Sequence, residues 1–137
     1  MTDKAIIELV CKVLDLDLDI MLSKEAPVPS GATLKEKHRY LYKETRQKQT
    51  YCEGRFIAAN FIIEKNGSTL ESIAFQFNYK LKSGKGDHSA ALYWNEQCEN
   101  LLRLKYKSFT EKFIKVKTEF INQSVNDIKD PNFKRIK

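Results

Sequence analysis

Two histidines and three cysteines are the side chains of this 137-residue sequence most able to act as a catalytic base or a nucleophile. Asp87, His88 and Ser89 have the residue types of a hydrolase triad, but adjacent side chains diverge, whereas triad partners must converge in space. His38 and His88 could supply the acid and base of a metal-free ribonuclease, yet nothing in the sequence places them together. The sequence therefore identifies no catalytic residue and favours a protein that is not an enzyme.

The cysteines and carboxylates also lack the spacing of a metal site. The cysteines are widely separated and do not form the paired-ligand pattern that binds zinc. Aspartates alternate over residues 15–19 as in a calcium loop. However, Ile20 stands where that loop needs glycine, and Ala26 stands where it needs a bidentate glutamate. We therefore expect no metal, no cofactor and no small-molecule ligand.

Positive charge is the clearest functional signal. The formal net charge is +6, and an acidic segment over residues 1–30 precedes a basic body, an asymmetry that suggests a polyanionic partner. Residues 101–117 contain six cations and one acid, Glu111. The cations are distributed around the predicted helix, so several of them can reach phosphates. These cations are Arg103, Lys105, Lys107, Lys112, Lys115 and Lys117.

A second basic segment, residues 34–56, interleaves tyrosines with cations. Such an arrangement can stack bases while it pairs with phosphates. The sequence thus predicts a small nucleic-acid-binding accessory protein, without distinguishing DNA from RNA. In the alternative interpretation the tyrosines are half-buried and the lysines only solvate a helix. The candidate nucleic-acid-binding residues are Arg39, Tyr40, Tyr42, Lys43, Arg46, Lys48, Arg103, Lys105, Lys107, Lys112 and Lys115.

The N-terminal segment supports a second hypothesis, a protein-binding adaptor or inhibitor that acts through apolar helices, with a homodimer as one form. Residues 3–22 follow an amphipathic helical pattern with Thr2 or Asp3 as N-cap, and their apolar face is unusually wide. Asp17 would interrupt that face, where an unpaired carboxylate is costly, so it is the candidate partner-binding residue. The alternatives are that the helix ends or bends near Leu16, or that Asp17 meets a structural cation.

A β-hairpin is predicted for the middle of the chain. Residues 73–81 alternate apolar and polar side chains, and residues 56–63 alternate in part, with Asn66-Gly67 between them. Pairing of the two apolar faces requires an odd-length loop with Gly67 in the left-handed conformation. A third strand at residues 38–45 would cover the sheet, although Thr33 equally predicts a helix that begins at Leu34.

The C-terminal part follows a helical pattern over residues 89–124, with Asp87 or Ser89 as N-cap and heptad spacing from Leu102. A continuous helix would be about 54 Å long, which exceeds a compact domain of this size, so we expect either a break around residues 105–108 or a helix that protrudes and pairs with another chain. The predicted fold is a single α+β domain over residues 1–130, with a hairpin packed against the two terminal helices. Residues 131–137 are predicted to form a basic tail.

The composition also bears on location. No apolar run reaches the length of a membrane span, and the charged N-terminus does not resemble a secretory signal. An odd number of scattered cysteines suits a reducing compartment. We therefore expect a cytoplasmic protein without a membrane partner.

Overall fold

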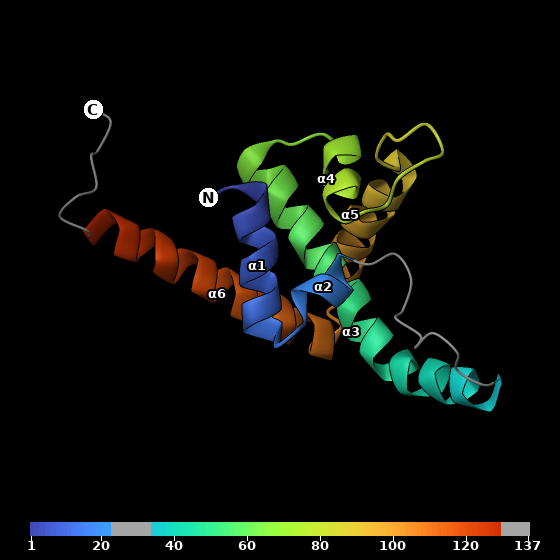
Figure 1. Ribbon diagram of the computed structural model, residues 1–137. Helices are drawn as coiled ribbons and strands as arrows, with labels where there is room; N and C mark the ends of the chain where they lie inside the picture. The colour runs from blue at the N-terminus through green and yellow to red at the C-terminus, as the bar shows by residue number, and fades with distance from the viewer. Residues whose placement is uncertain (23–33, 130–137) are drawn as a thin grey trace.

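The computed structural model is mostly helical in the parts that it describes, which are the backbone of residues 1–22 and 34–129 and the side chains of residues 1–22 and 49–123. Figure 1 shows the arrangement. The helices are α1 (Asp3–Leu14), α2 (Leu18–Met21), α3 (Leu34–Asn66), α4 (Leu70–Gln76), α5 (His88–Arg103) and α6 (Lys107–Lys129). Within these ranges no strand forms, and the backbone bridge between Lys80 and Gly86 is isolated. None of these helices is long and apolar enough to cross a bilayer.

The C-terminal half of α3 is the centre of the fold. All residues from Glu53 to Ile62 are buried. The helices α1, α4 and α5 pack against α3, and Phe113 and Phe120 of α6 reach the ring of Phe61. A helix that is surrounded in this way buries every face, so its sequence loses the polar stripe that normally reveals a helix.

The predicted α+β fold and its hairpin are wrong, and burial explains why. Residues 56–63 belong to α3, and the apolar run that resembles a strand is a helix covered on all sides. In α4 and its C-cap Phe77, the buried residues are Ile73, Ala74 and Phe77 while Phe75 is half exposed, which is helical spacing. Tyr79 and Leu81, which completed the alternation, lie beyond the end of α4.

Asn66-Gly67 joins two helices instead of two strands. Gly67 has φ of +64°, and its backbone N–H donates to the carbonyl of Ile63 at 3.0 Å. The left-handed conformation predicted for Gly67 is therefore confirmed, although it ends α3 and does not turn a hairpin. Residues 38–45, the predicted third strand, are also helical.

The helix predicted over residues 3–22 is divided in two, and the alternative that it ends near Leu16 is confirmed. Thr2 caps α1, as predicted, by accepting from the backbone N–H of Ala5, but α1 ends at Leu14 and Asp15 adopts a left-handed conformation. Asp17 then caps the short helix α2 by accepting from the backbone N–H groups of Asp19 and Ile20. Because α1 ends before Asp17, this residue does not interrupt the apolar face of a helix, and it is exposed.

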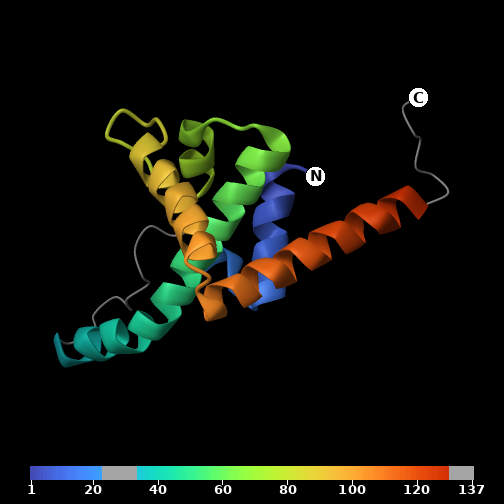
Figure 2. The same ribbon diagram turned by 180° about the vertical axis from the view of Figure 1, so that it is seen from behind.

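The C-terminal helix breaks close to the predicted place. Helix α5 has Asp87 as its N-cap and ends at Arg103, and α6 begins at Lys107. Lys105 in the connecting turn has φ of +55°, which redirects the chain. Helix α6 then packs against α1, and its far end projects beyond the other helices, as Figures 1 and 2 show. The predicted tail over residues 131–137 and the N-cap Thr33 lie outside the described residues.

Candidate functional site

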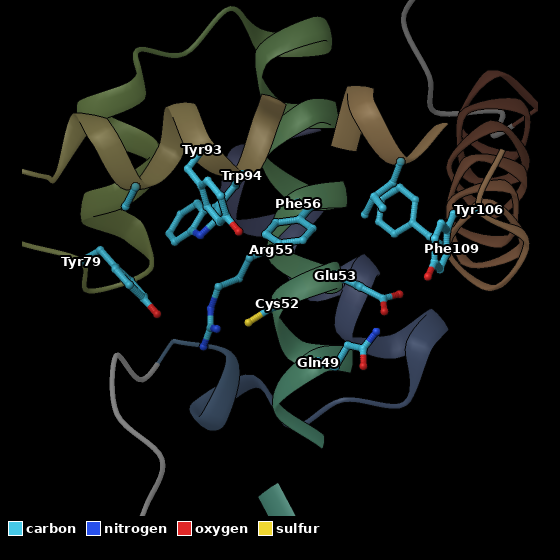
Figure 3. A pocket seen from close by; sticks show the side chains of 12 residues that line it. Gln49, Cys52, Glu53, Arg55, Phe56, Tyr79, Tyr93, Trp94, Tyr106 and Phe109 are labelled. Carbon is cyan, nitrogen blue, oxygen red and sulfur yellow. The ribbon is translucent and has the colours of Figure 1, made fainter. Parts of the chain in front are cut away.

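An open groove of about 730 Å³ lies between α3 and α5 and reaches the turn before α6. Helical spacing places its walls: residues 49, 52, 53 and 56 share one side of α3, and residues 90, 93, 94 and 101 share one side of α5. In Figure 3, Tyr79 lies at one end, Tyr106 at the other, and Phe56 between them. The lining residues are Gln49, Cys52, Glu53, Arg55, Phe56, Tyr79, Ala90, Tyr93, Trp94, Leu101, Tyr106 and Phe109.

Six of the twelve residues that line the groove are aromatic. Trp94 is buried and meets the ring of Tyr79 edge-on, with 4.9 Å between the centroids. Phe56 is also buried and meets Tyr93 edge-on at 5.9 Å. By contrast, Tyr93 and Tyr106 are 53% and 60% exposed. The groove therefore presents two open tyrosine side chains beside a packed aromatic floor.

The charged side chains within the groove already bind other parts of the protein. Glu53 accepts from Lys112 of α6, with 3.0 Å between Oε2 and Nζ. Arg55 donates to the carbonyl of Met21 at 3.2 Å and to that of Ile20 at 3.4 Å, so it caps the C-terminal end of α2. These groups stabilise the fold and do not form an acid–base pair for catalysis.

Exposed cations are neighbours in the sequence of Tyr106 and Tyr79, the residues at the two ends of the groove. At one end, Arg103, Lys105 and Lys107 alternate with the exposed side chains Leu104 and Tyr106. We call residues 103–107 the basic turn. At the other end, three exposed lysines follow Tyr79 in the loop between α4 and α5. They are Lys80, Lys82 and Lys85, and we call residues 80–86 the lysine loop.

Backbone contacts hold the lysine loop in place. The N–H of Leu81 donates to the carbonyl of Lys85 at 2.8 Å, and the N–H of Asp87 donates to that of Tyr79 at 2.7 Å. Gly86 is buried, and a Cβ at this position would lie 1.8 Å from the carbonyl oxygen of Glu71. The loop is therefore a built feature that requires glycine at residue 86.

The structure separates the cations predicted from sequence into three groups. Arg103, Lys105, Lys107 and Lys115 are exposed, and the first three lie in the basic turn. Lys112 is half-buried and paired with Glu53. The remaining candidates lie on the N-terminal part of α3, where the side chains are outside the described part of the chain: Arg39, Tyr40, Tyr42, Lys43, Arg46 and Lys48.

Asp17, the predicted partner-binding residue, does not line the groove. Its carboxylate caps α2, and its backbone N–H donates to the hydroxyl of Tyr51 at 3.0 Å. The exposed carboxylate therefore has a structural task at the start of a helix.

Sequence reasoning missed the lysine loop and the two exposed groove tyrosines. Three lysines and two glycines within residues 80–86 indicate a basic loop. The strand predicted over residues 73–81 included Lys80, so the loop was not recognised. The sequence does not indicate that Tyr93 and Tyr106 are exposed in a groove. Helical spacing alone does not show whether a neighbouring helix covers a side chain.

Among the described residues, the groups that the sequence suggested for catalysis or metal binding are capping, exposed or buried side chains that do not gather at one site. Asp87 uses its carboxylate to cap α5 through the N–H of Ser89, and His88 is exposed. No group of three potential ligands gathers within this part of the chain. Burial raises the pKa of Cys11 to about 11 and that of Cys98 to about 12, which makes both poor nucleophiles.

Comparisons with protein-family models, with curated proteins and with solved structures found no match to this chain. The functional assignment therefore depends on side chains and their geometry.

Proposed function

We propose that this protein is a nucleic-acid-binding accessory protein that contacts phosphates through the basic turn and the outer face of α6. The observation that carries the proposal is the exposure of Arg103, Lys105, Lys107 and Lys115. None of these four forms an ion pair with a described carboxylate, whereas Lys112 does. Exposed cations grouped in this way neutralise phosphates and release counterions.

Packing of α6 supports this assignment. Phe109 and Val116 are buried, and Phe113 stacks on Phe61 of α3, so the inner face of α6 is committed to the core. At 100° per residue, Lys107 and Lys115 lie on the side away from these residues. The cations are thus held on a rigid helix and on the turn that begins it.

The chemistry of the surface predicts little sequence specificity. Lysine ammonium groups bind phosphates as point charges, and phosphate contacts position a nucleic acid without reading its bases. An accessory role in coating or holding nucleic acid fits these properties better than recognition of a defined site.

A matched pair of double variants tests the proposal. The variant Lys105→Gln/Lys107→Gln removes two charges from the basic turn. The control Lys4→Gln/Lys65→Gln removes two exposed charges outside the basic turn, one in the first turn of α1 and one in the last turn of α3. We expect the first variant to lower the magnitude of the salt slope of binding to a labelled single-stranded oligonucleotide by about 1.5 and the control to leave it near the wild-type value. Equal slopes for both variants would remove the basic turn from the site.

A second candidate function, protein binding, has one specific observation in its favour. Ile114 and Ile121 are half exposed and lie seven residues apart on the outer face of α6. This spacing places them on one stripe, as in a helix that packs on a partner helix. Sedimentation of the wild type and of Ile114→Lys/Ile121→Lys tests whether the stripe joins two copies; a concentration-independent monomer in both cases would reject that dimer.

We propose a reducing compartment, such as the cytoplasm, as its location. The three cysteines are free thiols, which is typical of proteins in a reducing compartment.

A further inference from the structure

We propose that the groove between α3 and α5 holds unpaired bases, so that the nucleic acid bound is single-stranded. This inference rests on the proposed function and adds the class of nucleic acid. It starts from Tyr93 and Tyr106, which line the groove and are more than half exposed. A base gains stacking on such a ring only if its own face is free, and bases inside a duplex are already stacked on their neighbours.

The size of the groove fits a short stretch of single strand. The lining residues extend from Ala90 to Leu101 on α5, which is about 16 Å at 1.5 Å per residue. Consecutive nucleotides in a stacked strand are about 3.4 Å apart, so the groove accommodates about four or five of them.

Charge around the groove complements the phosphates of such a strand. The basic turn flanks the Tyr106 end, and the lysine loop follows Tyr79 at the other end. Of the exposed acids of α5, Glu99 lies on the side of that helix opposite to its groove-lining residues, whereas Glu96 lies one turn from Tyr93. Glu53, the acid that lines the groove, is neutralised by Lys112.

The polar groups of the groove favour a strand of bases over an acidic peptide. An extended peptide needs hydrogen-bond partners for its backbone. Glu53 is engaged with Lys112 and Arg55 with the carbonyls of α2, which leaves Gln49 and the hydroxyls of Tyr93 and Tyr106 to serve a peptide backbone. Stacking on a tyrosine ring requires no hydrogen-bond partner.

Fluorescence anisotropy with four labelled probes of similar length tests the inference. The probes are a thymidine 12-mer, an abasic 12-mer with the same phosphodiester backbone, a 12-base-pair duplex and a polyglutamate peptide. We expect the thymidine strand to bind about tenfold or more tightly than the abasic strand, because only the former can stack. It should also bind more tightly than the duplex.

Ring-removing variants locate the stacking. Tyr93→Leu and Tyr106→Leu should each weaken binding of the thymidine strand by about tenfold and leave the abasic strand unchanged. Tyr93→Phe and Tyr106→Phe, which keep the ring, should retain binding. Equal binding of thymidine and abasic strands, or tighter binding of the duplex, would overturn the inference while leaving the phosphate surface intact.

Failure of the proposed function gives a different result. If neither strand nor the duplex binds, the phosphate surface itself is absent; binding of the polyglutamate peptide alone would assign the groove to an acidic protein partner and overturn both proposals. Cys52 offers a check that needs no variant, because its partly exposed thiol lines the groove. Saturating thymidine strand should slow alkylation of Cys52 at least fivefold, and an unchanged rate would place the strand elsewhere and overturn the inference.

Discussion

Lys112 of α6 donates a hydrogen bond to Glu53 of α3, with 3.0 Å between Nζ and Oε2. The Glu53 side chain is 9% exposed and that of Lys112 is 27% exposed, so this contact joins the last helix to the central one through a largely buried ion pair. It also removes one cation from the surface that sequence alone assigns to nucleic acid. On α6, Lys112 therefore stabilises the fold, whereas the exposed Lys107 and Lys115 are left to contact a partner.

Replacing Lys112 by alanine should destabilise the protein by about 1–3 kcal/mol, because the buried Glu53 carboxylate would lose its partner. Urea denaturation monitored by the fluorescence of Trp94 measures this change. The double variant Lys112→Ala/Glu53→Gln should recover part of the loss, since no unpaired charge remains. A single variant as stable as wild type would show that the pair contributes nothing to the fold.

Asp3 should give the protein an acid-sensitive contact between α1, the end of α3 and α4. Burial would raise the pKa of Asp3, but hydrogen bonds from Asn66, Ser68 and Gln76 outweigh it and hold the pKa below its usual value. A lowered folded-state pKa stabilises the protein above the unfolded pKa near 3.8, and this contribution disappears as the pH falls through the folded value.

Comparison with Asp3→Asn isolates that contribution. The variant should be less stable than wild type at pH 5–7, and the difference should shrink as the pH falls below the unfolded pKa near 3.8 and through the lower folded-state pKa of Asp3. Urea midpoints measured between pH 2.5 and 7 follow this difference. A difference that stays constant across the whole range would contradict the assignment.

The three cysteines should differ sharply in reactivity. Burial raises the pKa of Cys11 to about 11 and that of Cys98 to about 12, whereas Cys52 is partly exposed. At pH 8, iodoacetamide should therefore modify Cys52 first, because the thiolate is the reactive form. Peptide mass spectrometry of the folded protein measures the rates, with urea-unfolded protein as the control in which all three react. Comparable rates for Cys98 and Cys52 in the folded state would contradict the packing described.

Gly86→Ala should destabilise the protein by about 1–3 kcal/mol, because the new Cβ would collide with the backbone carbonyl of Glu71. Gly67→Ala is the matched control, since Gly67 has φ of +64° but open space around it. The control should cost only the backbone strain of a left-handed alanine, about 1 kcal/mol. Thermal unfolding ranks the two variants, and a smaller loss at residue 86 than at residue 67 would contradict the loop geometry.

Local signals in the sequence predicted the ends of helices better than the fold. The caps Thr2 and Asp87, the left-handed Gly67 and the break before α6 follow from residue type and short-range geometry. The hairpin failed because α3 is buried on all sides, and its apolar run therefore has no helical period to detect. Burial of this kind depends on how distant helices pack, which local patterns do not contain.

Local sequence patterns also indicated one part of the candidate site, its cluster of cations, and missed the parts that depend on helix packing. The cations of the basic turn are visible in the sequence as a cluster, and they are exposed; their role in binding nucleic acid stays a prediction. The pairing of Lys112 with Glu53 joins residues 59 positions apart and has no local signature. The groove depends in the same way on how α5 packs beside α3.

The most direct test of nucleic-acid binding is the salt dependence of the wild-type protein on a labelled single-stranded 12-mer between 50 and 200 mM salt. Four phosphate contacts, one for each of Arg103, Lys105, Lys107 and Lys115, predict a log–log slope of about −3 for a single strand. Submicromolar affinity at the low-salt end with a slope of this size would support the proposed phosphate surface. Absence of binding at 50 mM salt, where phosphate contacts are strongest, would contradict it.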